Sequence, residues 1–482
     1  MKKNISKLFL YRYRFHIGYI ILGIAFIALL LLMPRIAPNG LSQAEIDSAA
    51  TSYNLHIETI ATGDLVNLPY HVLQKFSIKY IGFNEYAIKL PSIIIGIILG
   101  FLLILLLNRW FKSNVALLAS ILTVLSVPFL WLAGSGSPLI MLVFWPTFLL
   151  WLGSKIQGVK KPRPLYCFVF AFALLLSLFT PHLPYLVFFI ALFAFFNPHL
   201  RFTIKSLPKI PLIISAIVIL GGVGLIIYNI FNRSDVIIEL LFAKNFSLNQ
   251  FLPNLKQAFT PYFSWNGHLE SVYLSPLINL ATVAIAIIGV LSTSRGFFAS
   301  RNSIAFYFIL FTAFLSGFNP DSAMLIVLPL AILVAHGLRY ILEKWYGLFP
   351  ENPYARVFGI LPISIFLGLI IISDLAHYME GYKYNPSVAN QFNTDLSIIN
   401  QHVENNKTLL IAADNPNLNF YKILEEKRNI TIINSLTDLH NDEAYSLGKI
   451  EELPENVKLS QIITSPKTEN SDRIYVYTVK SN

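Results

Sequence analysis

Repeated long apolar runs constrain this chain more than any other feature of its sequence. Runs of about 20 residues, enough for a helix to cross about 30 Å of hydrocarbon, begin near residues 16, 90, 114, 138, 210, 276, 303, 323 and 357. Two shorter runs, "LYCFVFAFALLLSLF" and "YLVFFIALFAFF", flank "TPHLP" and predict a hairpin of short spans. We therefore predict an α-helical polytopic membrane protein with about eleven spans.

Composition excludes several other classes of protein. The 482 residues are 55% hydrophobic and only 13% charged, whereas a soluble domain usually carries about 25% charged residues. The net charge of +10 is spread over small groups between the apolar runs, with no basic stripe of the kind that binds nucleic acid. The single cysteine, Cys167, permits neither an intrachain disulfide nor a CxxC metal or redox site.

The basic groups also predict orientation. With the N-terminus inside, every short inner loop contains Lys or Arg, and the outer turns at "GSGS", "TPHLP" and "FNPDS" contain neither. The first run is too long for a signal peptide and lacks an A-x-A site, so we interpret it as an uncleaved span. The expected location is the cytoplasmic membrane of a bacterium, with the C-terminal domain outside.

Three long outer segments follow from this topology: residues 35–89, residues 232–275 and the tail. We divide the chain into a transmembrane domain, residues 1–376, and a small soluble α/β domain, residues 377–482. In the tail, "KTLLIAAD", "ITIINSL", "SQIITS" and "RIYVYTV" read as strands, and "LSIINQHVENN" and "NFYKILEEKR" read as helices. The tail contains no P-loop, no GxGxxG and no Cys/His cluster, so we expect a lid or an acceptor-binding module.

The first outer segment and the spans after it carry a recognisable pattern. The string "GFNEYAIKLPS", residues 82–92, is similar to "FG-x-(S/N)-E-x-A-x-R-L-P-S" of the GT-C membrane glycosyltransferases, the protein mannosyltransferase and aminoarabinose transferase group. The resemblance covers residues 15–160 well and the later spans in layout. It implies a GT-C-like fold and transfer of a sugar from a polyprenyl-phosphate donor to a lipid, glycan or protein acceptor, without a cofactor.

The resemblance also implies site residues. The family's catalytic Asp-Glu pair falls on Ala44 and Glu45, so Glu45 is the expected acid or base, with Asp47 in reserve. A general base must lie within hydrogen-bond reach of the nucleophile. Lys89 stands where the family has Arg, as a phosphate or structural partner. The family's "K-P-P-L-Y" stretch corresponds to "NLPYH", residues 67–71.

That correspondence makes Tyr70 and His71 candidate substrate-binding residues. Lys75, a basic residue of the same outer segment that could steady the leaving phosphate, is a further candidate. No HExxH, HxxxH or DxD motif is present in the outer segments, so we expect no metal. Asp321 in "FNPDS" is a further outer acid, and its commoner role is in a turn.

Two alternatives stay open at this point. Ser42-x-x-Glu45 is also a capping-box pattern, in which Glu45 serves a helix N-terminus. The Asp, the Lys and a later Arg of the family are missing, so either the catalytic group has moved or the second hypothesis holds: a non-catalytic GT-C-like scaffold or lipid-linked saccharide binder. A transporter ranks third, because the spans lack the charged residues that mark a solute path.

Overall fold

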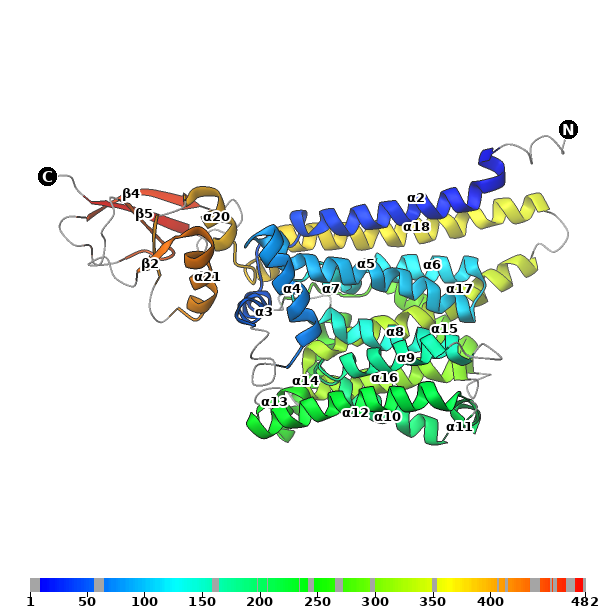
Figure 1. Ribbon diagram of the computed structural model, residues 1–482. Coiled ribbons are helices and arrows are strands. Elements are labelled where there is room, and N and C mark those ends of the chain that lie inside the picture. Colours follow the sequence, from blue (N-terminus) through cyan, green and yellow to red (C-terminus); the bar gives the residue numbers. More distant parts are fainter. Residues whose placement is uncertain are drawn as a thin grey trace.

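The computed structural model describes residues 9–55, 65–157, 164–196, 198–205, 207–233, 235–241, 247–264, 272–294, 300–348, 353–404, 407–411, 415–433, 443–450, 453, 457–464 and 473–479. Helices dominate, and a small sheet lies near the C-terminus (Figure 1). The chain is a polytopic membrane protein with a small C-terminal α/β domain. The predicted fold class is therefore confirmed.

Each of the eleven apolar runs forms helix in the described part of the chain. In chain order the helices are α2 (Phe9–Ile36), α5 (Glu85–Trp110), α6 (Ser113–Val124) with α7 (Val127–Gly134), α8 (Ile140–Gln157), α9 (Pro164–Ser177), α10 (Leu183–Phe196), α12 (Lys209–Asn232), α15 (Leu280–Ser294), α16 (Ser300–Phe318), α17 (Val327–Leu348) and α18 (Pro353–Tyr384).

Not all of these helices are full-length spans. Five described segments are long and apolar enough to cross a membrane: 17–36, 85–110, 209–232, 320–348 and 361–384. The run from residue 114, for which the sequence predicts one span, is broken: the helix axes of α6 and α7 differ in direction by 64°. Pro128 stands in the first turn of α7, where its missing N–H costs nothing, so a new helix starts there. The remaining apolar helices are shorter.

Small residues let two of the helices approach closely. At Gly289 of α15 a Cβ atom would stand 2.0 Å from the Leu333 carbonyl oxygen, and at Gly337 of α17 it would stand 2.0 Å from the Ile285 carbonyl oxygen. Glycine at both positions therefore permits backbone contact between α15 and α17, as in other membrane helix pairs.

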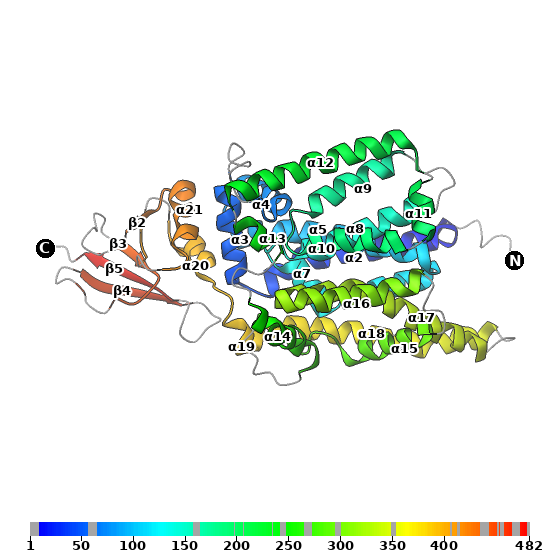
Figure 2. The ribbon, with the colours of Figure 1, turned by 90° about the horizontal axis from the view of Figure 1, so that it is seen from below.

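Short helices gather at one end of the bundle, the end that carries the C-terminal domain, while the start of α2 lies at the other end (Figures 1 and 2). They are α3 (Gln43–Asn54), α4 (Leu68–Ile81), α13 (Asp235–Leu241), α14 (Phe251–Phe263) and α19 (Pro386–Ala389), with the 3₁₀ turns η2 (Leu248–Gln250) and η3 (Pro320–Ile326). At the opposite end, α11 (Pro198–Lys205) follows α10. We call the end with the C-terminal domain the outer end, after the predicted orientation.

The C-terminal domain has one five-stranded sheet, in the order β2-β1-β3-β5-β4. Strands β1 (Thr408–Leu410), β2 (Thr431–Ile433) and β3 (Glu443–Ser446) pair in parallel around β1. Strands β4 (Val457–Thr464) and β5 (Arg473–Val479) add an antiparallel edge. Helices α20 (Asp395–His402) and α21 (Leu418–Arg428) complete the domain.

The C-terminal domain shares an apolar core with the outer helices. One cluster of buried side chains contains Ile46 of α3 and Phe83 together with Phe420 and Leu424 of α21. The rings of Phe83 and Phe420 lie 5.0 Å apart. The boundary predicted after residue 376 falls inside α18, which continues to Tyr384.

Candidate functional site

Glu45 lies in the first turn of α3 and is buried, with 1% of its surface exposed. Its Oε2 accepts the Ser42 backbone N–H at 2.7 Å, and the Ser42 side chain completes the capping box that the sequence pattern predicted. Its Oε1 accepts the Gly136 backbone N–H at 2.5 Å. The Glu45 carboxylate therefore joins α3 to the connection between α7 and α8.

Lys89 lies fully buried in α5 and reaches the backbone that leads into α3. Its Nζ donates to the carbonyl oxygens of Pro38 at 2.9 Å and Gly40 at 2.7 Å. Gly40 adopts φ +96°, and a Cβ there would stand 2.7 Å from the Asn393 carbonyl oxygen, so only glycine fits. This places Lys89 as an anchor of the segment before α3, with two of its three N–H donors engaged on carbonyls.

A buried network, which we call the α3–α4 network, joins Ser48 and Ser52 of α3 to His71 and Gln74 of α4. The Ser52 Oγ lies 2.7 Å from His71 Nδ1, and both serine hydroxyls donate to Gln74 Oε1. Gln74 Nε2 then donates to the Gly136 carbonyl oxygen at 2.8 Å. Gly136 is thus bonded on both its N–H and its C=O.

Tyr70 extends this buried polar region. Its hydroxyl lies 2.8 Å from Ser92 Oγ. Burial is the main cause that raises the pKa of the Tyr70 phenol, and the charge of Glu45 adds to it. Tyr70 therefore stays a neutral hydrogen-bonding group close to Glu45.

The other two predicted residues lie elsewhere. Asp47 is exposed and accepts a hydrogen bond from Gln43 at 2.9 Å, while Lys75 is half-buried and donates to the Leu55 carbonyl oxygen. The structure brings Glu45, Lys89, Tyr70 and His71 into one buried region and leaves Asp47 on the outside of α3. The catalytic and substrate-binding roles of all six stay predictions.

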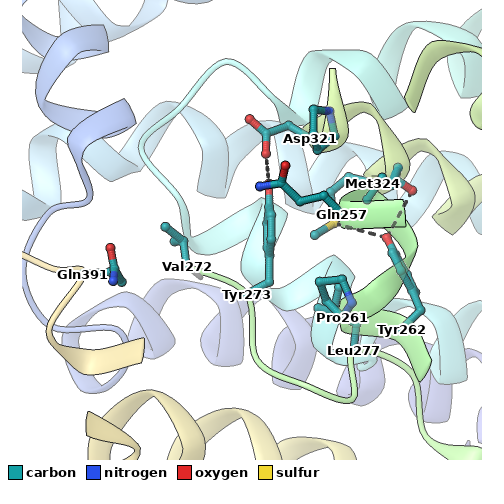
Figure 3. A pocket seen from close by; sticks show the side chains of 12 residues that line it. Gln257, Pro261, Tyr262, Val272, Tyr273, Leu277, Asp321, Met324 and Gln391 are labelled. Atoms are coloured by element: carbon teal, nitrogen blue, oxygen red, sulfur yellow. Dashed lines mark hydrogen bonds between the residues drawn. The ribbon is translucent and has the colours of Figure 1, made fainter. Parts of the chain in front are cut away.

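A cavity of about 240 Å³ opens between α14, η3 and the segment before α15. Figure 3 shows Asp321 and Tyr273 at its centre, with Gln257 beside them and Tyr262 and Met324 on one side. The Tyr273 hydroxyl donates to Asp321 Oδ1 at 2.5 Å. Burial, and then the nearby Asp321 carboxylate, raise the pKa of the Tyr273 phenol well above its ordinary value. Tyr273 is therefore a neutral donor that fixes the carboxylate.

The sequence predicts a turn role for Asp321, and the residue does lie in the 3₁₀ turn η3, whose N-cap is Asn319. The Asn319 side chain accepts the Asp321 backbone N–H at 3.0 Å and so caps η3. The Asp321 side chain is left to line the cavity. No spacing in the sequence joins Asp321 to Tyr273, 48 residues earlier. The available signal was an acid in an outer turn without a basic neighbour.

Aromatic contacts connect the cavity to the rest of the outer end. The Tyr273 ring lies 4.8 Å from the ring of Trp131 in α7, five residues before Gly136. The Tyr382 hydroxyl donates to the Val272 carbonyl oxygen at 3.2 Å. The cavity and the Glu45–Gly136 contact therefore belong to the same end of the bundle, the first against α7 and the second at the connection that follows α7.

One further titratable group is buried beside η3. His182, in the turn between α9 and α10, lies with Nδ1 3.1 Å from Ser322 Oγ. Burial lowers the pKa of His182 to about 4. Within the described ranges, no three His, Cys, Asp or Glu side chains form a group that could bind a metal ion.

Two solved structures match almost the whole chain. One is ArnT from Cupriavidus metallidurans bound to undecaprenyl phosphate, with a TM-score of 0.52, 14% identity, and coverage of 96% of this chain and 98% of that one. The other is ArnT from the same organism in the apo state, with a TM-score of 0.51, 15% identity and the coverage 96% and 98%. The chain has a GT-C-like fold. No family model matches the sequence, and no curated protein matches it.

Proposed function

We propose that this protein is a membrane glycosyltransferase that moves a sugar from a polyprenyl-phosphate donor to an acceptor at the outer face of the cytoplasmic membrane. The observation that carries the proposal is the match over 96% of the chain to a GT-C structure bound to undecaprenyl phosphate. The acceptor is a lipid, a glycan or a protein, and neither nucleic acid nor a cofactor takes part. The C-terminal domain lies outside and the N-terminus inside.

The arrangement of the outer end supports this proposal. Transfer requires an acceptor O–H or N–H to attack the anomeric carbon as the phosphate leaves, with a carboxylate in reach to take the proton. Three carboxylates at this end are candidates: Glu45, Asp47 and Asp321. Glu45 is the one that the resemblance implies, and its contact with Gly136 must open before an acceptor can reach it.

A specific observation also supports the second candidate function, a non-catalytic binder of lipid-linked saccharides. Both oxygens of Glu45 already accept backbone N–H groups, which is a complete structural role for this residue. The position of the family's Asp holds Ala44, which cannot take a proton. A protein of this kind would keep the fold and bind the donor without cleaving it.

The decisive test is transfer from a panel of radiolabelled polyprenyl-phosphate sugars, using membranes that contain the wild type, Glu45→Gln, Asp47→Asn or Asp321→Asn. Transfer by the wild type supports the enzyme. A loss of at least about a hundredfold in kcat in one variant, measured at saturating donor and acceptor, identifies the base, since general base catalysis contributes about 10²–10⁴-fold. Folding of each variant is checked by its thermal unfolding midpoint. Saturable binding of a donor without transfer from any donor supports the binder.

A further inference from the structure

The cavity around Asp321 has a chemical character that differs from the one expected at a lipid phosphate. Its lining includes one carboxylate, Asp321, two tyrosines and the amides of Gln257 and Gln391. None of the described residues that line it carries a positive charge. A phosphate would meet only a like charge there, and phosphate sites are normally built from Lys, Arg or backbone N–H donors.

The size of the cavity selects a small ligand. A volume of about 240 Å³ is the volume that about eight molecules occupy in liquid water. Pockets for drug-sized ligands usually measure about 300–1,000 Å³. The cavity therefore has room for one sugar ring, and a polyprenyl chain or further sugar units would have to lie outside it.

The donors and acceptors match the hydroxyl groups of a sugar. The Tyr273 hydroxyl donates to Oδ1 of Asp321. Among the residues that the structure describes, none donates a hydrogen bond to Oδ2. The Gln257 amide offers both a donor and an acceptor beside it (Figure 3). The carboxylate oxygen can accept a hydrogen bond from one sugar hydroxyl, and the amide beside it can donate to or accept from the adjacent hydroxyl.

The apolar part of the lining also suits a sugar. Pro261, Leu277 and Met324 contribute carbon and sulfur surface, and Tyr262 and Tyr273 contribute rings. The electron-rich face of an aromatic ring attracts the slightly positive C–H groups of a pyranose or furanose. Tyr262 is fixed in place, because its hydroxyl donates to the Ala323 carbonyl oxygen at 3.1 Å.

We infer that this cavity is the binding site for one sugar ring without a negative charge, with Asp321 accepting a hydrogen bond from the sugar and Tyr273 positioning Asp321. The inference rests on the proposed function, and it adds the location of the sugar and its separation from the carrier phosphate. Asp321 and Gln257 then determine which hydroxyl pattern is accepted. The ring comes either from the donor or from the acceptor.

The experiment measures equilibrium binding of radiolabelled pentoses and hexoses, both neutral and amino-substituted, to the full-length protein in lipid nanodiscs. We compare the wild type with Asp321→Asn, Tyr273→Phe and Gln257→Ala. Asp235→Asn, a change of the same kind at an α13 residue that does not line the cavity, is the matched control. Unchanged thermal unfolding midpoints show that a variant is folded, and Tyr273→Phe, which keeps the ring, provides the mildest change.

We expect saturable binding of at least one sugar, with Kd raised at least about tenfold by Asp321→Asn, as the loss of a charge-assisted hydrogen bond predicts. Tyr273→Phe should raise Kd less, and Asp235→Asn should leave it unchanged. Inorganic phosphate and sugar-free undecaprenyl phosphate should not compete. A sugar whose binding is lost when an acceptor analogue saturates the protein belongs to the acceptor, and one displaced only by the intact donor belongs to the donor.

Three results would overturn the inference: no saturable sugar binding, sugar affinity unchanged in all three cavity variants, or competition by inorganic phosphate. The transferase proposal fails separately. Sugar binding that depends on Asp321 without transfer from any donor would leave the cavity assignment standing and reject the enzyme. Transfer with unchanged KM values in the cavity variants would support the enzyme and reject the assignment of the cavity.

Discussion

The carboxylate of Glu45 accepts the backbone N–H of Gly136, 91 residues away in the sequence, at 2.5 Å. The same carboxylate accepts the Ser42 N–H, so one side chain both caps α3 and attaches it to the α7–α8 connection. The residue expected to supply chemistry is thus also the residue that positions the helix carrying it. Activity and stability measurements must be combined to separate these two roles.

Glu45→Gln is expected to destabilise the folded protein. Glutamine keeps the size of the side chain, but one of its ends is an NH₂ group that would face a backbone N–H donor. An unsatisfied buried donor costs about 1–3 kcal/mol, so the thermal unfolding midpoint in detergent should fall. Asp47→Asn, an exposed change on the same helix, should leave the midpoint unchanged. Equal midpoints for both variants would contradict the structural role of Glu45.

Lys89→Met is expected to loosen the segment before α3. The change leaves the Pro38 and Gly40 carbonyl oxygens without their buried cation partner. Hydrogen–deuterium exchange should rise in residues 37–42, where the Leu41 N–H is bonded to the Asn393 carbonyl oxygen at 2.8 Å. Lys79→Met, on the exposed side of α4, is the control and should not change this exchange. Exchange that is the same in both variants would show that Lys89 does not anchor the segment.

Phe83→Ala is expected to weaken the attachment of the C-terminal domain. Phe83 is 6% exposed and packs on Phe420 of α21. Removing a buried phenyl ring typically costs about 3–5 kcal/mol, so exchange in α3 and α21 should rise together. Phe76→Ala, a change at a half-exposed position of α4, should have little effect. Protection of α21 that survives Phe83→Ala would mean that the shared core does not join the two parts.

Stability should fall with acid in a window set by His182. Burial lowers its pKa from 6.5 to about 4, so the unfolded chain binds more protons than the folded one between these values. The stabilisation is present above about pH 6.5 and is lost as the pH falls towards 4, by up to about 3 kcal/mol. His182→Gln should flatten the dependence of the unfolding midpoint on pH, and the exposed His402→Gln should not. A steep dependence that persists in His182→Gln would assign the effect to another group.

The sequence predicted the parts of the fold that depend on local pattern. Each apolar run forms helix because a lipid-embedded backbone must satisfy its own hydrogen bonds. The Ser42-x-x-Glu45 spacing predicted the capping box, because the pattern is complete within one turn. In the tail, the strands that contain Leu409, Ile432, Ile462 and Val476 were all predicted from their β-branched and aromatic content.

Features that depend on distant contacts were missed. Strand β3 has only four residues, "EAYS", whose composition does not favour a strand, and it forms because β1 and β5 lie on either side of it. The apolar run from residue 114 predicts one continuous span, and its pattern does not report the break between α6 and α7. The pairing of Asp321 in η3 with Tyr273 in the segment before α15 depends on how η3 packs beside α14, which no spacing in the sequence reports.

The measurement that tests the central claim most directly is the fate of a polyprenyl-phosphate sugar, labelled in both lipid and sugar, when mixed with an excess of purified wild-type protein and a panel of acceptors. The account predicts that, within one turnover, labelled polyprenyl phosphate appears in step with labelled sugar on one acceptor. Donor that is bound saturably and recovered intact with every acceptor would contradict transfer and leave the protein as a binder.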